Sequence, residues 1–164
     1  MKSIDLDEAD LRLLALLQDD ATHNNQRLAE LAHVSAPTSL RRIKRLRELG
    51  LIERQVALLQ PDRLAELTGH GLTALVEITL ERQGAEQLQA FEDLAVAEAS
   101  VQQCYRVSPG PDFVLVVHSR DMVEHLALSQ RLFASDANVR NVKAFFSLRR
   151  AKFDPRLPLP RSAA

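Results

Sequence analysis

The chain has 164 residues, of which 46% are hydrophobic, and its 21 Lys and Arg against 22 Asp and Glu give a formal net charge of −1. This composition is typical of a soluble globular protein, and no apolar run approaches the roughly 18 to 20 residues that a membrane-spanning helix needs. The N-terminal MKSIDLDEAD lacks the apolar stretch of a signal peptide, and Cys104 has no second cysteine to pair with, so we expect a cytoplasmic protein with a reduced thiol.

The first expected helix covers residues 4–17. Its leucines recur at three-to-four-residue spacing, Asp7 is a candidate N-cap, and Asp10 lies in the first turn, where a helix favours acidic groups. After a polar turn, a second short helix is expected over residues 25–32, and the chain then reaches Ser35. This helix and the one that follows it, two short helices joined by a tight turn, are typical of a helix-turn-helix motif, with residues 35–49 in the recognition position.

The third helix, in the recognition position, is bounded by its own sequence. Ser35 is a good N-cap residue, and Gly50 is placed to end the helix in the left-handed conformation. Three apolar residues at helical spacing, Leu40, Ile43 and Leu46, are predicted to face the core.

The opposite face of this helix carries hydroxyl groups and a dense run of positive charge. Between Ser35 and Arg54 there are six basic and two acidic residues, although the whole chain is nearly neutral. The DNA major groove admits a helix, and Arg binds its acceptors bidentately. A basic helix taken alone also fits a solvated surface, and the helix-turn-helix context favours DNA. The residues predicted to face and contact double-stranded DNA are Ser35, Thr38, Ser39, Arg41, Arg42, Lys44 and Arg45.

Residues 51–58 alternate in polarity, which predicts a strand, the wing of a winged helix-turn-helix domain, with Arg54 and Gln55 within reach of a phosphate. Pro61 breaks this pattern, and residues 63–71 are interpreted as a connecting segment. The predicted division is a winged helix-turn-helix domain at 1–60, a second domain at 61–150 and a basic, proline-containing tail at 151–164.

The second domain is predicted to be an α+β ferredoxin-like (ACT-like) βαββαβ sandwich, with an antiparallel sheet covered on one face by two helices. Inward positions on the helices include Leu94, Met122 and Leu126. The other sheet face carries Val114, Val116 and Phe145 and is too apolar to stay in water, so we expect at least a symmetric dimer. The expected elements are strands at 72–80, 101–108, 113–119 and 139–148, a helix at 84–97, and a helix opened by a capping box of Asp121 and Glu124.

Several stretches together resemble one family. The segments are LDEADLRLLALLQDD, SAPTSLRRIKRLRELGLI, ALLQPDRL and LVEITL, and they are similar to the Lrp/AsnC family of bacterial and archaeal transcriptional regulators over about residues 3–150. The Ser-x-x-Thr start of the recognition helix and the later βαββαβ domain occur in the right order. The resemblance implies a DNA-binding N-terminal domain, a C-terminal domain that forms homodimers and often octamers, and amino-acid effectors bound between dimers.

The resemblance also implies an effector turn between the second and third strands of the C-terminal domain. Ser108 to Phe113 match it in part, but Pro109 stands where the family has glycine, and proline has no N–H to offer a ligand carboxylate. Asp112 could accept a ligand's ammonium group or merely close its turn, and Phe145 could pack the sheet instead of contacting a ligand. The effector-binding residues implied are Ser108, Gly110, Asp112, Phe145 and Ser147.

Nothing in the sequence indicates catalysis. There is no HExxH motif, no cysteine pair and no glycine-rich phosphate loop, so we expect no enzyme activity, metal or cofactor. One alternative on the same fold is a tetrapyrrole-binding enzyme resembling the sirohaem decarboxylases, in which His118 and His125 would hold the ligand with nearby arginines. Another is a ligand sensor that no longer binds DNA, which conflicts with the basic recognition helix. The tail is expected to be extended and solvated, although its positive charge could touch DNA or another subunit.

Overall fold

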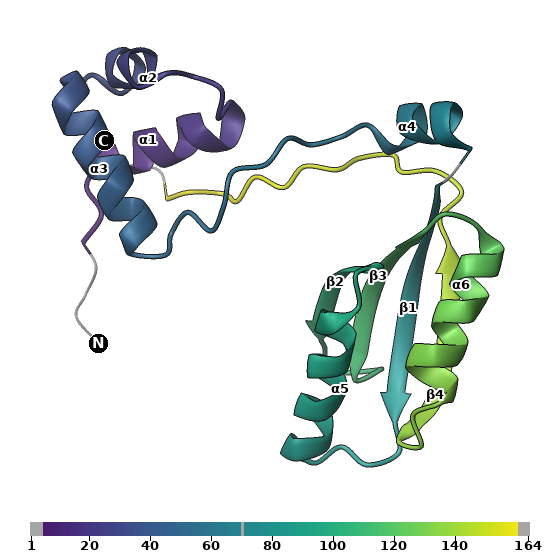
Figure 1. Cartoon of the computed structure of the whole chain (residues 1–164). Helices are drawn as coiled ribbons and strands as arrows, with labels where there is room; N and C mark the ends of the chain where they lie inside the picture. The colour runs from purple at the N-terminus through teal and green to yellow at the C-terminus, as the bar shows by residue number, and fades with distance from the viewer. Residues whose placement is uncertain (1–4, 70, 161–164) are drawn as a thin grey trace. The chain divides into compact units, whose positions relative to one another are not determined.

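The computed structural model describes residues 5–69 and 71–160, which form two units (Figure 1). The first unit holds the described residues up to Leu58 and also the tail from Lys152 onwards, while the second runs from Leu59 to Ala151. The tail therefore belongs to the N-terminal unit and is not a separate segment, while its residues 151–158 are exposed, as its composition indicated.

The first unit is a three-helix motif of α1 (Glu8–Asp19), α2 (Asn25–Ala32) and α3 (Ala36–Glu48). Each helix begins at the polar residue that can accept its first free N–H groups: Asp7, Asn24 and Ser35 accept from the residue three positions on. The helices enclose a small core of Leu13, Leu28, Ala32 and Ile43. The predicted helix-turn-helix is confirmed.

The packed face of α3 differs from the prediction by one position at its start. Ser39, Ile43 and Leu46 are buried, whereas Leu40 is 62% exposed. The predicted series of Leu40, Ile43 and Leu46 and the observed series that begins at Ser39 both have helical spacing. Hydrophobicity alone therefore favours Leu40 over Ser39 as the buried residue. The short Ser39 side chain lets α3 lie close to its neighbours, so packing decides against the larger residue. The prediction that Leu40 faces the core and Ser39 faces outward was wrong.

Several connections contain left-handed residues. His33 closes α2 at φ 57°, an uncommon conformation for a residue with a Cβ, and Gly50 follows α3 at φ 71°, as predicted. Residues 51–58, all described by the structure, form no strand, so the predicted wing is absent. An isolated extended run has no partner to satisfy its backbone groups. The predicted connector at 63–71 is mostly helical, because α4 (Pro61–Thr68) starts at a proline and ends at left-handed Gly69.

The second unit has the predicted βαββαβ order. Its elements are β1 (Leu72–Leu80), α5 (Ala85–Ala97), β2 (Val101–Arg106), β3 (Phe113–Ser119), α6 (Met122–Ser129) with a π-helical turn (Gln130–Ala134), and β4 (Val139–Phe146). The strands form one antiparallel sheet in the order β2-β3-β1-β4 (Figure 1).

The helices α5 and α6 cover one face of this sheet. Alternate residues of β1 and β3 are buried there against Phe91, Leu128 and Phe133. Leu94, Met122 and Leu126, predicted to point inward, are exposed instead. On α6 the buried residues are His125 and Leu128, a series that continues into Leu132 and Phe133 of the π-helical turn and so fixes the rotation of the helix.

On the opposite sheet face, several apolar side chains of the described residues are exposed. Leu75 pairs with Val116 on one side and Phe145 on the other, and Leu75 and Phe145 are 44% and 53% exposed. Tyr105, opposite Val114, extends the same surface. We call this surface, defined by Leu75, Tyr105, Val114, Val116 and Phe145, the open sheet face.

Candidate nucleic-acid interface and effector region

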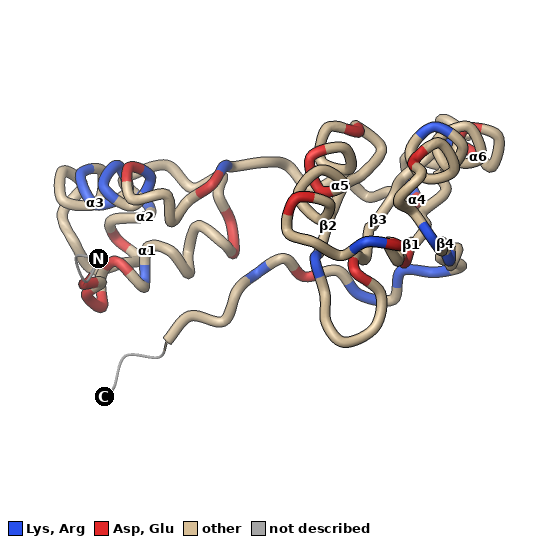
Figure 2. The backbone as a smooth tube through the Cα atoms, turned by 90° about the horizontal axis from the view of Figure 1, so that it is seen from below, with Lys and Arg blue, Asp and Glu red and all other residues tan. Residues whose placement is uncertain are grey.

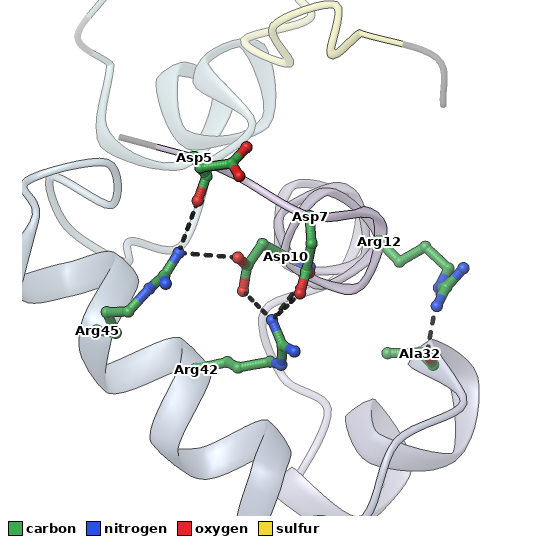
Figure 3. A network of polar contacts seen from close by, with 7 residues as sticks. All are labelled: Asp5, Asp7, Asp10, Arg12, Ala32, Arg42 and Arg45. Atoms are coloured by element: carbon green, nitrogen blue, oxygen red, sulfur yellow. Dashed lines mark hydrogen bonds and ion pairs between the residues drawn. The ribbon is translucent and has the colours of Figure 1, made fainter. Parts of the chain in front are cut away.

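A buried carboxylate joins α1 to α3. Asp10 is 1% exposed, and it accepts hydrogen bonds from Arg42 Nη1 at its Oδ1 and from Arg45 Nη2 at its Oδ2, both at 2.9 Å. Arg42 Nη1 also lies 2.7 Å from Asp7 Oδ2, and Arg45 Nη2 donates to the carbonyl oxygen of Asp5. Figure 3 shows both guanidinium groups pointing at the Asp10 carboxylate. Two of the basic residues predicted to contact DNA are thus held by the protein itself.

The charges around Asp10 reinforce one another. The pKa of Asp7 is lowered, first because its carboxylate accepts the backbone N–H of Asp10 and then because Arg42 lies beside it. The pKa of Arg42 is raised, chiefly by its hydrogen bond to Asp10. A buried carboxylate is costly unless paired, and here its partners come from the recognition helix, so the pairing fixes α3 against α1.

The outer face of α3 keeps a different set of groups. Arg41 is exposed and Lys44 is 77% exposed, with only a long 3.8 Å contact from Lys44 Nζ to Glu48. Leu40 lies beside them in sequence and is also exposed. Arg45 is 47% exposed and has one side open to solvent. Figure 2 shows the basic residues of α3 gathered along the helix. This surface, defined by Leu40, Arg41, Lys44 and Arg45, is called the outer α3 face below.

The hydroxyl residues at the start of α3 serve the helix first. The Ser35 hydroxyl accepts the N–H of Thr38 and donates to the Thr38 hydroxyl at 2.8 Å. Ser39 is fully buried, and its hydroxyl has no hydrogen-bond partner among the described residues. Of the predicted hydroxyl contacts, Ser35 and Thr38 remain near the surface, and Ser39 cannot contact DNA in this packing.

Sequence reasoning missed the partners of the arginines. Asp10 was assigned to helix-dipole stabilisation, which explains an acid in a first turn but not its burial. The available signal was the placement of Arg42 and Arg45 three residues apart on α3, beside a face that also packs. Arg12 makes a second link, donating from Nε to the carbonyl oxygen of Ala32 at the end of α2 (Figure 3).

The predicted effector residues fall into two groups. Asp112 closes the end of β1: its N–H donates to the carbonyl of Ile78, and its Oδ2 accepts the N–H of Leu80 at 2.7 Å. Ser147 lies at the other end, where its N–H donates to the carbonyl of Thr73. Thr73 and Ile78 are five steps apart along the strand, which is about 17 Å. The turn of Ser108, Gly110 and Asp112 therefore does not meet Phe145 and Ser147 within one subunit.

The two histidines of the tetrapyrrole alternative lie on opposite faces of the sheet. His125 is buried on the helix side, edge-on to Phe146 at 5.0 Å, and burial lowers its pKa. His118 is on the other side, where Nδ1 lies 3.1 Å from the Thr73 hydroxyl. One ligand cannot reach both. Within the described ranges there is no cluster of metal-binding side chains, and none of the helices there is long and apolar enough to cross a membrane.

Replacing Asp10 with Asn is expected to destabilise the N-terminal unit. The substitution removes the negative charge that pairs with two guanidinium groups. Breaking a buried ion pair lowers the unfolding free energy by about 3 to 5 kcal/mol, and we expect about 3 kcal/mol because both arginines are partly exposed. Urea unfolding followed by circular dichroism measures the loss. The matched control is Glu8→Gln, which breaks the exposed pair with Arg12 on the same helix and should cost under about 1 kcal/mol. Equal losses in the two variants would contradict a special role for Asp10.

Comparison with known proteins accounts for both units. A family model described as "Lrp/AsnC ligand binding domain" matches residues 73–157, and one described as "Winged helix-turn-helix DNA-binding" matches residues 6–53. The DNA-binding transcriptional activator DecR of Escherichia coli (strain K12) is 31% identical over 154 residues, 94% of this chain and 99% of the relative. The glutamate uptake regulatory protein of Zymomonas mobilis is 31% identical, covering 96% of this chain and 93% of the relative.

Solved structures agree with this assignment. An AsnC family transcriptional regulator from Agrobacterium tumefaciens has a TM-score of 0.82 at 29% identity, covering 93% of this chain and 97% of that one. A transcriptional regulator from Neisseria meningitidis, solved as an L-Met complex, has a TM-score of 0.82 at 25% identity, covering 94% of this chain and 97% of that one. With the helix-turn-helix unit and the βαββαβ unit both matched, the chain belongs to the Lrp/AsnC family of DNA-binding transcriptional regulators.

Proposed function

We propose that this regulator binds its operator DNA through the outer α3 face. Arg41 is the best candidate for reading a base, because its side chain is exposed and the structure gives it no internal partner among the described residues. Lys44 is placed to neutralise a phosphate, and Leu40 offers an apolar surface of the kind that contacts a thymine methyl group. Arg42 serves to hold the helix. The observation that carries this proposal is that Arg42 pairs with the buried Asp10, whereas Arg41 and Lys44 on the same helix are exposed to solvent.

The C-terminal unit is proposed to bind a small effector such as an amino acid. Support comes from the family match over residues 73–157 and from the L-Met complex of the Neisseria relative. Since the turn at 108–112 and the strand end at 145–147 are far apart in one subunit, a ligand that uses both groups requires a second copy of the chain. A homodimer, or an assembly up to an octamer, would provide this second copy. We also propose that the regulator acts on DNA in the cytoplasm and has no enzyme activity.

Replacing Arg41 with Ala is expected to weaken specific binding by about 1 to 3 kcal/mol and to relax preference at one base pair. Lys44→Ala should weaken binding to all DNA sequences alike and reduce the slope of log affinity against log salt concentration by about 1, as expected for the loss of one phosphate contact. The measurement is fluorescence anisotropy on fragments selected from random DNA by the intact chain, at two salt concentrations. Arg63→Ala, on exposed α4, is the charge-matched control. Unaltered affinity in an Arg41→Ala and Lys44→Ala double variant would contradict the proposed interface.

The open sheet face is expected to form the dimer contact, because its apolar side chains Leu75, Tyr105 and Phe145 are half-exposed in the single subunit. Leu75→Lys together with Phe145→Lys should shift the full chain from dimer or larger towards monomer in analytical ultracentrifugation at micromolar concentration. Val96→Lys, an equally large change at an exposed residue of α5, should leave the assembly intact. If the intact chain is a monomer, there is no dimer contact. If the double change leaves the assembly intact, the contact lies on another surface.

Asp112→Asn separates the two roles of that residue in effector binding. The amide oxygen can still accept the N–H of Leu80, so the turn keeps its hydrogen bond while the charge that would attract a ligand's ammonium group is lost. A thermal-shift screen of the twenty amino acids should find at least one that stabilises the intact chain. Its effect should disappear in Asp112→Asn while the unliganded melting temperature changes little. A stabilising amino acid that acts equally on both proteins would exclude Asp112 from the site.

A further inference from the structure

The tail is bound to α1 by a side chain that recognises its backbone. Gln18 accepts the N–H of Leu157 at its Oε1 over 2.7 Å and donates from Nε2 to the Leu157 carbonyl over 3.2 Å. An amide side chain paired in both directions with one residue imitates a strand neighbour, and it fixes an extended peptide regardless of which side chain that residue carries. The contact joins residues 139 positions apart in sequence.

An arginine fixes the register of the same segment. Arg156 Nη1 lies 2.6 Å from Asp19 Oδ1, and its Nε and Nη2 both donate to the Asp154 carboxylate at 2.9 Å. The pKa of Asp154 is lowered to about 2, chiefly by the hydrogen bond from Arg156. Asp19 is the last residue of α1, and that helix has no basic residue in its final turn. Arg156 thus supplies the positive charge that a helix C-terminus favours, from the far end of the chain.

Apolar residues of both segments lie at the docking site. A shallow groove of about 520 Å³ lies between α1 and the tail, lined by Leu11, Ala15 and Leu16 of the helix and by Leu157, Leu159 and Pro160 of the tail. Three prolines at 155, 158 and 160 restrict the segment to extended conformations, so little backbone freedom is lost when it docks.

The two sides of α1 therefore have different partners. Asp10 and Leu13 face the helices that include α3, while Leu11, Ala15 and Gln18 face the tail. The first unit, called the DNA-binding unit here because it carries the helix-turn-helix, contains two separate parts of the chain: the residues up to Leu58 and the tail from Lys152 onwards. The second unit, called the effector unit, lies between them in sequence. A tail that docks on the DNA-binding unit gives it a second tether.

We propose that residues 154–160 form a strap: an internal peptide that binds the outer side of α1 and restrains the DNA-binding unit. The occupant of this site is the chain's own tail, which carries the backbone pair at Leu157 and the charge at Arg156 that Gln18 and Asp19 match. With the strap docked, the distance between the recognition helices of a dimer is restricted. When it is released, residues 51–60 alone connect each DNA-binding unit to the rest of its chain. This consequence rests on the proposed function as a dimeric DNA-binding protein.

The docking is tested first, without DNA, on the full chain. Hydrogen exchange of the Leu157 amide is compared between the intact chain and a Gln18→Ala and Arg156→Ala double variant, with Arg149→Ala as the control for loss of one positive charge in the same region. Removing both contacts should accelerate exchange by about tenfold or more. The control should exchange as the intact chain does. Equal exchange in all three proteins would overturn the strap.

The restraint is tested on DNA that carries two half-sites. The intact chain should prefer half-sites in phase, about 10 bp or its multiples apart, over the same half-sites displaced by about 5 bp. In the double variant this preference should fall severalfold while binding to a single half-site stays unchanged. If exchange at Leu157 accelerates but the spacing preference is retained, the tail docks without restraining and the strap is overturned. If the intact chain binds no DNA at all, the proposed function fails, while the exchange result still decides whether the tail docks.

Discussion

The buried Asp10 carboxylate is the constraint on which the DNA-binding unit depends. A carboxylate removed from water must be paired, and both of its oxygens are satisfied by guanidinium groups from α3. Because Arg42 and Arg45 pair with Asp10, the rotation of α3 is fixed, and Arg41, Lys44 and the exposed side of Arg45 lie on the outer α3 face. The same basic run therefore holds the helix and offers the protein's positive surface, and the position of each residue on the helix decides which of the two it does.

The helix that carries Asp10 has several tasks at once. One side of α1 contributes Leu13 to the core and Asp10 to the contact with α3, and the other side receives the tail through Gln18 and Asp19. The effector unit has its own core between the sheet and α5 and α6, so each unit has the buried apolar surface that a stable domain requires. The tail, which follows the second unit in sequence, is docked on α1 through Gln18 and Asp19.

Much of the fold could be predicted because its signals are local. Asp7 and Ser35 mark helix starts through their own hydrogen bonds, and the period-two alternation placed the limits of β1 and β3 where the structure has them. What could not be predicted depends on partners distant in sequence. Ser39 and Leu40 satisfy the helical period equally, and only close packing separates them. The wing needed a second strand, and the pairing of Asp10 with Arg42 links positions 32 apart. The effector residues were expected to act between dimers, and the distance along β1 between their two groups could not be read from the sequence.

The coupling between Asp10 and Arg42 tests this account most directly. Unfolding free energies of the intact chain, Asp10→Asn, Arg42→Gln and the double variant form a cycle that isolates the interaction of the two side chains from their separate effects. We expect a coupling of about 1 to 3 kcal/mol, within the range of about 0.5 to 3 kcal/mol for residues in one network of hydrogen bonds and salt bridges. Additive effects within about 0.5 kcal/mol would show that the two groups do not depend on each other, and would contradict the claim that Asp10 sets the recognition helix.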